Sequence, residues 1–240
     1  MILLFTDFGH EGPYVGQMHT VLAQAAPGVP AIDLMHDAPA FAPRLSAYLL
    51  ASLIPELPRD AIICAVVDPG VGSDRAPLLV KADERWLIGP DNGLLAIAAR
   101  RAGHAAFHVL TETPERLSAS FHGRDLFAPA AASVARGDMP DSRPLDTRPV
   151  GANWPDDLCE IVYIDHYGNA MTGLRADKLG NRVLVAGGRR LPRVRTFSDC
   201  APGEAFWYEN SSGLAEIAVN QGSAAATFDL EIGSAVKAQG

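Results

Sequence analysis

An uninterrupted apolar run, Ala61–Val67, leads directly into Asp68 and a glycine-rich turn. Because no residue of the run is polar, it predicts a strand covered on both faces, as in a parallel sheet flanked by helices. Ligands of such sheets bind beyond the carboxyl ends of the strands, where Asp68 would emerge. Asp68 therefore either caps the turn by accepting backbone N–H groups or faces a site, and this run alone favours neither.

The first half of the chain alternates between strand and helix patterns. This alternation predicts an α/β domain over residues 1–136 with a mainly parallel sheet. Proline residues mark the ends of the first two helices. The expected strands are 2–6, 31–35, 61–67 and 107–110, with a β-ribbon of 78–81 and 86–89, and the expected helices are 14–26, 45–54, 94–101 and 125–135.

Residues 137–157 contain four prolines and little hydrophobic periodicity, which predicts a linker. Beyond it, residues 158–240 consist of short alternating runs broken by glycine, a rhythm typical of a small all-β barrel or sandwich. The expected strands are 160–164, 183–185, 205–208, 214–219, 225–230 and 235–238.

Composition limits the partners of the chain. The 28 acidic and 20 basic residues give a net charge of -8, which argues against nucleic acid as a partner. Three widely separated cysteines fit neither a disulfide framework nor a zinc site, so we expect a cytoplasmic protein without a metal ion. The apolar residues 2–5 are too few for a signal peptide or a membrane span.

Four strings in the first half place polar groups directly after an apolar run: Thr6–Gly9, Asp68–Arg75, Gly89–Gly93 and Ser120–Asp125. Since the first and third strands of such a sheet commonly end near each other, Asp7 and Asp68 are expected at one cleft. For Asp7, a local turn bond is the alternative.

Other residues of these strings are expected to be structural. Asp91 and Asn92 are expected to cap the following helix, and Asp125 its own helix. His122 and Arg124 are then the candidates for chemistry. The glycines after the first strand lack the G-x-G-x-x-G spacing, which argues against a nicotinamide cofactor.

In the second half, the string Tyr163–Asn169 sets polar acceptors and an aromatic residue around a tight turn. A plain hairpin explains this string equally well, and Asn210–Gly213 and Val219–Gly222 have the same ambiguity. Phe197 and Trp207 are either platforms for a ligand or core residues.

Taken in order over nearly the whole chain, these strings resemble the adenosine-forming S-adenosyl-L-methionine (SAM) hydrolases, also called SAM hydroxide adenosyltransferases, which are relatives of fluorinase and chlorinase. The resemblance implies an α/β domain followed by a β-barrel domain. It implies a homotrimer whose sites lie between the N-terminal domain of one subunit and the C-terminal domain of a neighbour. The implied reaction is attack of water or hydroxide on the ribose C5′ of SAM, which releases adenosine and L-methionine without a cofactor.

The resemblance also implies roles for individual residues. Asp68, Arg75 and His122 match the catalytic triad of the family, and Asp7 matches the residue that holds the ribose hydroxyls. The other implied contacts are Asp165, Asn169 and Ser211 with the methionine portion, and Tyr167, Phe197 and Asn220 near the adenine.

The nucleophile is the point on which this family divides. The halide-using relatives have tyrosine at the position of Asp68, where a carboxylate would repel an incoming halide. The turn 83–85 also lacks the long insertion of fluorinase. Phe41 and Gly173 depart from the hydrolase pattern at the edge of the implied pocket. The alternatives are a SAM-dependent halogenase that uses chloride and a non-catalytic protein that binds adenosine or SAM.

Overall fold

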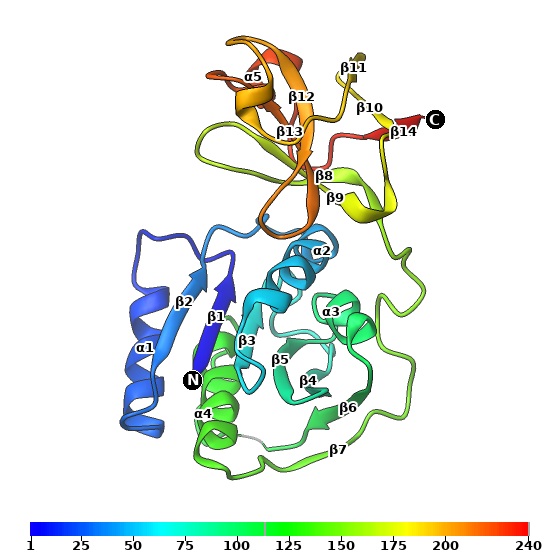
Figure 1. Cartoon of the computed structure of the whole chain (residues 1–240). Coiled ribbons are helices and arrows are strands. Elements are labelled where there is room, and N and C mark those ends of the chain that lie inside the picture. Colours follow the sequence, from blue (N-terminus) through cyan, green and yellow to red (C-terminus); the bar gives the residue numbers. More distant parts are fainter. Residues whose placement is uncertain (113, 240) are drawn as a thin grey trace. The chain divides into compact units, whose positions relative to one another are not determined.

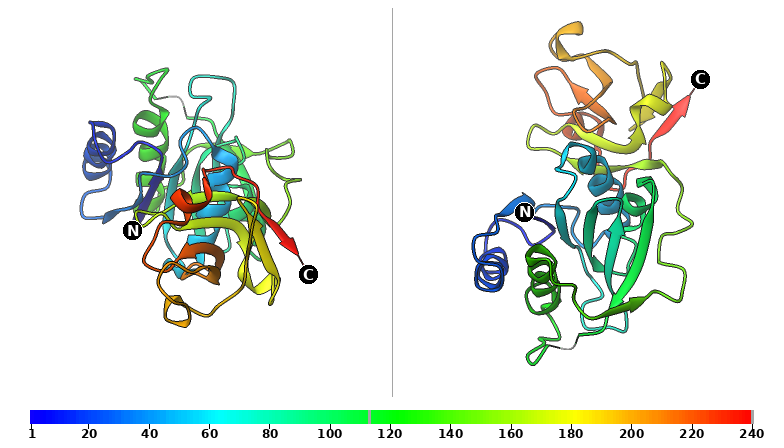
Figure 2. Two further views of the ribbon diagram at one scale, coloured as in Figure 1. Left: turned by 90° about the horizontal axis from the view of Figure 1, so that it is seen from above. Right: turned by 60° about the horizontal axis from the view of Figure 1, so that its bottom comes forward.

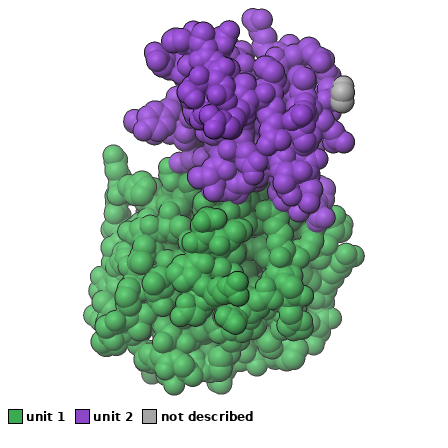
Figure 3. Space-filling model, in the orientation of Figure 1, with its two compact units in different colours: residues 1–154 green, residues 155–240 purple. Residues whose placement is uncertain are grey.

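The computed structural model describes residues 1–112 and 114–239, and the chain forms two compact units. Unit 1 comprises Met1–Trp154 and unit 2 begins at Pro155; Figure 3 shows the first in green and the second in purple. The boundary falls inside the segment 137–157 that the sequence predicts as a linker. None of the helices in the described residues is long and apolar enough to cross a membrane.

Unit 1 is built on one seven-stranded sheet of order β2-β1-β3-β5-β4-β6-β7. Its strands are β1 Ile2–Thr6, β2 Ala31–Met35, β3 Ile62–Val66, β4 Pro77–Ala82, β5 Arg85–Pro90, β6 Ala105–Leu110 and β7 Ser142–Pro144. β2, β1, β3 and β5 are parallel neighbours, whereas β4 and β7 run against theirs, so five of the seven strands point the same way. The predicted α/β class with a mainly parallel sheet is confirmed.

Helices cover both faces of this sheet, which explains why β3 has no polar residue. They are α1 Tyr14–Ala25, α2 Pro43–Leu53, α3 Ala96–Arg101 and α4 Ala128–Arg136, with the short turns η1 Ile54–Glu56 and η2 Gly123–Phe127. α1 and α4 lie side by side in every view (Figures 1 and 2), and their Met18 and Ala131 share a core with Leu4 and Cys64 of the sheet. Alternate strand residues such as Phe5 face the opposite side, where α2 and α3 pack against each other.

Most of the segment predicted as a linker is part of unit 1. β7 pairs with β6, and the guanidinium of Arg100 donates to the carbonyl oxygens of Gly151 and Trp154, at 2.8 and 2.5 Å. The segment is rich in proline, but the pairing of β7 with β6 and the hydrogen bonds from Arg100 to backbone carbonyls attach it to unit 1.

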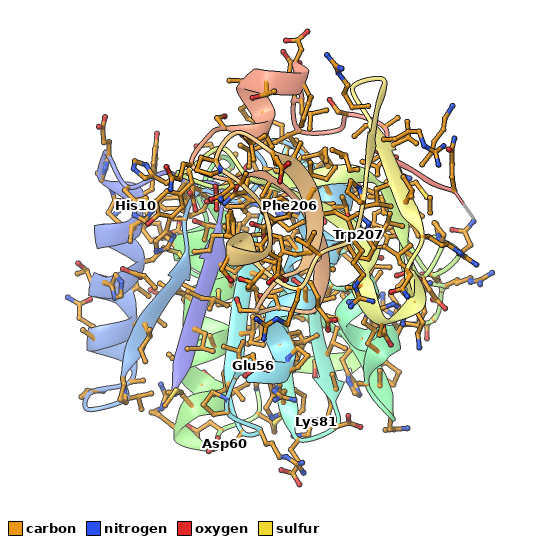
Figure 4. All side chains as sticks on the ribbon, turned by 45° about the horizontal axis from the view of Figure 1, so that its top comes forward. His10, Glu56, Asp60, Lys81, Phe206 and Trp207 are labelled. Atoms are coloured by element: carbon orange, nitrogen blue, oxygen red, sulfur yellow. The ribbon has the colours of Figure 1, made fainter. Side chains whose placement is uncertain are left out.

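Unit 2 contains two antiparallel sheets, of order β12-β13-β9-β8 and β11-β10-β14. Its elements are β8 Leu158–Ile164, β9 Ala170–Arg175, η3 Ala176–Lys178, β10 Val183–Ala186, β11 Arg189–Leu191, η4 Phe197–Asp199, β12 Ala205–Glu209, β13 Leu214–Val219, α5 Ala224–Phe228 and β14 Lys237–Gln239. Both sheets contribute to one core, which includes Ile161, Leu184 and Trp207. Phe206 and Trp207 point to opposite sides of β12 (Figure 4). The prediction that the second domain is built mainly of β-strands is confirmed.

The predicted strand 225–230 is wrong. The segment forms helix α5 because Ser223 caps it, with the Ser223 Oγ accepting a hydrogen bond from the N–H of Ala226 at 3.1 Å, and because alanine favours helix. Strand β9 is absent from the predicted set, since Gly173 interrupts its apolar pattern. Gly173 leaves no room for a side chain, because a Cβ there would lie 2.6 Å from the Cβ of Leu158.

Candidate functional site

Asp7 and Asp68 line one cavity of about 630 Å³ in unit 1. They follow two adjacent parallel strands, β1 and β3, whose last residues Thr6 and Val66 are paired. The same register therefore brings both carboxylates to one edge of the sheet, beyond the carboxyl ends of the strands. The volume lies within the range of small-molecule sites.

The glycine-rich turn after β3 returns Arg75 to Asp68. The N–H of Val71 donates to the carbonyl of Asp68, and both the N–H and the hydroxyl of Ser73 donate to the carbonyl of Gly70. Gly72 has a φ of +81°, and a Cβ at this position would lie 2.5 Å from the carbonyl oxygen of Ala119. The turn thus needs glycine at 72 for both conformation and space.

Asp68 and Arg75 form a buried ion pair, with side chains only 4% and 9% exposed. The Arg75 Nε donates to Asp68 Oδ1 and Oδ2 at 2.9 and 2.8 Å, and Nη2 also contacts Oδ2. The guanidinium lies over the ring of Phe127, 5.4 Å from its centroid. Fork-like pairing of this kind fixes the orientation of both groups.

His122 completes this cluster from the loop that precedes η2. The Nη2 of Arg75 lies 2.9 Å from the Nδ1 of His122. A guanidinium only donates, so Nδ1 must accept and the proton of the neutral ring resides on Nε2. Burial, followed by the charge of Arg75, lowers the pKa of His122 below its ordinary value of 6.5. The residue therefore presents a neutral imidazole to the cavity that it lines.

Asp7 lies in the turn that follows β1 and lines the same cavity. Its Oδ2 accepts from the backbone N–H of Phe41 at 3.1 Å, and the preceding Thr6 Oγ1 accepts from the N–H of Phe8 at 3.2 Å. Burial raises the pKa of Asp7, against the opposing effect of the Phe41 N–H, and the charge of Asp68 adds to the increase. A donor supplied by a ligand would replace the hydration that this carboxylate has lost.

Phe41 lies at the edge of the same cavity in an unusual backbone conformation. Its φ is +59°, which is rare for a bulky residue, and its side chain is 78% exposed. Phe41 and Gly173 are the two residues that differ from the hydrolase pattern. Phe41 lines this cavity, whereas Gly173 lies in a packed hairpin of unit 2.

The helix caps expected in this unit are not formed as predicted. Asp91 Oδ1 accepts from the N–H of Val150, and α3 begins only at Ala96, with no side-chain cap. Asn92 caps only the turn that precedes α3, because its Oδ1 accepts from the N–H of Leu94 at 3.2 Å. It also ties this turn to β3, because its Nδ2 donates to the carbonyl of Val67 at 2.8 Å.

Asp125 does not cap a helix either. It pairs with Arg124, with Nε to Oδ1 at 2.6 Å, and accepts from the N–H of Ser118. Arg124 lines the cavity, and its Nη1 donates to Oε1 of Gln17, another lining residue, at 2.7 Å. This hydrogen bond holds the Arg124 and Gln17 side chains in place at the cavity wall.

A second cavity, also of about 630 Å³, lies within unit 2. Among the candidate residues of the sequence analysis, Asp165, Tyr167, Asn169 and Phe197 line it, as do Val219, Gln221 and Gly222 of the string Val219–Gly222. Asp165 shapes the β8–β9 turn, because its Oδ1 accepts from the N–H groups of Tyr167 and Asn169 at 2.9 and 2.8 Å. Its Oδ2 accepts from the Asn169 side chain at 2.9 Å. The predicted hairpin is therefore confirmed, and the same turn forms part of the cavity wall.

Ser211 and Asn220 do not line this cavity. Ser211 is exposed in the turn between β12 and β13, and Asn220 donates from Nδ2 to the carbonyl of Cys200 at 2.8 Å. Trp207, named as a candidate platform, is fully buried in the core, where its indole N–H donates to the carbonyl of Arg182.

Sequence reasoning missed Tyr208, which lines the second cavity, and Glu216 behind it. The sequence does contain a signal for Glu216, which is the one ionisable residue within the apolar run 214–219.

In the described residues, no group of three or more His, Cys, Asp or Glu side chains is arranged to hold a metal ion.

Comparison with known proteins gives consistent matches over the chain. Residues 2–143 match the SAM hydroxide adenosyltransferase N-terminal domain, and residues 159–237 match the SAM hydroxide adenosyltransferase C-terminal domain. An (R)-S-adenosyl-L-methionine hydrolase from Thermus thermophilus is 40% identical over 262 residues, which cover 98% of each chain. A fluorinase from Actinopolyspora mzabensis is 23% identical, over 99% of this chain and 96% of its own. A crystal structure of an uncharacterized conserved protein from Thermotoga maritima matches with a TM-score of 0.87, 27% identity and full coverage of both chains.

The turn after β3 is testable through its glycine. Gly72→Ala is expected to lower the free energy of unfolding by about 2 kcal/mol or more, since it adds a clash with Ala119 to the strain of a positive φ. The matched control is Gly28→Ala, which has a φ of +82° but nothing within 4 Å of the new Cβ, and which should cost about 1 kcal/mol. Equal losses in urea unfolding would contradict the close approach of Gly72 to Ala119.

The tautomer of His122 is testable by NMR. Its ring is expected to titrate below 6.5 and to carry its proton on Nε2 when neutral, because of burial and the Arg75 contact. In Arg75→Ala, the midpoint should rise, since a positive charge that opposes protonation is removed while Asp68 remains. A proton on Nδ1 in the neutral protein, or a midpoint above 6.5, would show that the Arg75 contact is not formed.

Proposed function

This chain belongs to the SAM hydroxide adenosyltransferase family, and from that membership we propose that it is an enzyme that hydrolyses SAM to adenosine and L-methionine. The observation that carries the proposal is the Asp68–Arg75–His122 cluster at the end of β3, beside a cavity of small-molecule size. The family membership supports the reaction, and the contacts within the cluster support the roles that the family resemblance implies for its three residues.

The proposed reaction is an in-line displacement at the ribose C5′. An oxygen of water forms a bond to C5′ while the bond from C5′ to sulfur breaks, and the electron pair stays on sulfur. Methionine leaves as a neutral thioether, so the leaving atom needs no general acid and we propose that no cofactor is required. The enzyme then has to hold the water and C5′ in line and receive one proton.

We assign the residues of the cluster different tasks. Asp68 orients the water by accepting one of its hydrogens, and it takes the proton as the new bond forms. Arg75 fixes the orientation of Asp68 by donating to both of its oxygens. Because Arg75 occupies the Nδ1 lone pair of His122, the imidazole donates from Nε2 to an oxygen at the reacting centre and does not act as the base in this arrangement.

Substrate binding is divided between the two cavities in this proposal. Asp7 accepts from the two ribose hydroxyls, whose donors compensate for the burial that raises its pKa. Asp165 and Asn169 bind the polar end of methionine, and the rings of Tyr167 and Phe197 pack on the adenine. The roles of Ser211 and Asn220 rest on the family resemblance, since neither lines the second cavity.

We further propose a homotrimer in which each site combines the first cavity of one subunit with the second cavity of a neighbour, as the family resemblance implies. One large exposed side chain at each cavity is available for such a contact, since Phe41 and Tyr167 are 78% and 75% exposed. We propose a cytoplasmic location, which fits three free cysteines.

The reaction is tested by incubating the protein with SAM in ¹⁸O-labelled water, with and without chloride. We expect adenosine that carries ¹⁸O at the 5′ oxygen, with methionine formed in equal amount and no effect of chloride on product identity. The Asp68 carboxylate would repel chloride at this position. A 5′-chlorinated nucleoside would indicate a halogenase, and bound but intact SAM would indicate a binding protein; either result would refute hydrolysis.

A further inference from the structure

Glu216 is a carboxylate in the interior of unit 2. It lies in the middle of β13, a strand in which every residue is buried, and it is only 2% exposed. Tyr208 of β12 is its cross-strand partner. A charge in such a place costs free energy unless hydrogen bonds satisfy it, so its contacts indicate its role.

Both oxygens of Glu216 accept hydrogen bonds, one of them from a residue that lines the second cavity. Oε1 accepts from the hydroxyl of Tyr208 at 2.6 Å, and Oε2 accepts from Nδ2 of Asn210 at 2.8 Å. Asn210 in turn shapes the following turn, because its Oδ1 accepts from the N–H groups of Ser212 and Leu214, each at 3.0 Å. One carboxylate therefore fixes a phenol ring and a turn at the same time.

These two groups are tied to substrate binding by position. Tyr208 lines the second cavity, and its ring centroid lies 5.1 Å from that of Phe197, another wall residue. The turn carries Ser211, which the family resemblance places at the methionine portion. Burial, opposed by the donors Tyr208 and Asn210 and reinforced by the charge of Asp165, raises the pKa of Glu216.

We propose that Glu216 is a positioning residue that holds Tyr208 and the 210–214 turn in the geometry required to bind SAM. The inference rests on the proposed function, because it concerns the same substrate. Glu216 itself does not line the cavity, so it acts through the residues that it orders. Fixing these groups before the substrate arrives lowers the entropic cost of binding.

The test uses the variant Glu216→Gln in the full-length protein. Glutamine keeps the shape of the side chain but replaces one acceptor oxygen with an NH2 group. Since Tyr208 and Asn210 donate to different oxygens of Glu216, one of them loses its acceptor in this geometry. We expect the KM for SAM to rise about tenfold, with kcat changed less than about twofold. Hydrogen exchange at the N–H groups of Ser212 and Leu214 should become faster.

A matched control is Thr172→Val. It removes a buried hydrogen bond from Thr172 Oγ1 to the carbonyl of Ala215, the neighbour of Glu216, without touching Tyr208 or Asn210. We expect a loss of thermal stability, no change in KM and no change in exchange at the 210–214 turn.

The outcomes separate this inference from the proposed function. An unchanged KM in Glu216→Gln, or an equal rise of KM in Thr172→Val, would overturn the positioning role. Absence of SAM turnover by the unmodified protein would instead refute the proposed function. Hydrogen exchange of the turn needs no substrate, so unchanged exchange in Glu216→Gln would refute the ordering of the turn in either case.

Discussion

The buried ion pair between Asp68 and Arg75 is the interaction on which the first cavity depends. Each charge has lost most of its hydration, and the guanidinium fork compensates by donating to both carboxylate oxygens. The pair also fixes its neighbours: Arg75 directs an N–H at His122 and so selects the tautomer of that ring. Removing one partner would leave the other charge buried without compensation, at a cost of about 3–5 kcal/mol.

This pair links the fold to the proposed chemistry. A strand covered on both faces delivers Asp68 to the edge of the sheet, and Gly72 allows the chain to return Arg75 to it. In the proposed reaction, the carboxylate held in this way accepts a hydrogen from water and repels a halide. With a leaving group that departs as a neutral thioether, orientation of the water accounts for most of the catalytic requirement.

Local patterns predicted the parts of the structure that local forces decide. The apolar run before Asp68 and the strand order placed Asp7 and Asp68 at one edge of the sheet, because parallel register brings equivalent strand ends together. In contrast, the partner of Asp91 is the N–H of Val150, 59 residues away, and no local pattern encodes that contact. Helix α5 was missed because a serine cap and alanines outweigh an alternating pattern.

The candidate site was predictable to different degrees. The position of Asp68 followed from its strand, whereas the contact of His122 with Arg75, 47 residues apart, was implied only by the family resemblance. The sequence indicates a special role for Glu216, because a single carboxylate within an apolar run is expected to be buried and to need hydrogen-bond donors. Its partners Tyr208 and Asn210 became evident only from the cross-strand register.

The most direct test of the account is the single-turnover rate of Asp68→Asn with SAM. Asparagine retains the size of the side chain but not the negative charge, so the rate should fall by about two to four orders of magnitude while adenosine still binds. Asp157→Asn, which disrupts an Asp–Arg pair with Arg175 in unit 2, serves as the control for loss of an ion pair. A rate for Asp68→Asn within about threefold of the unmodified protein would contradict the assignment of Asp68 as the group that activates water.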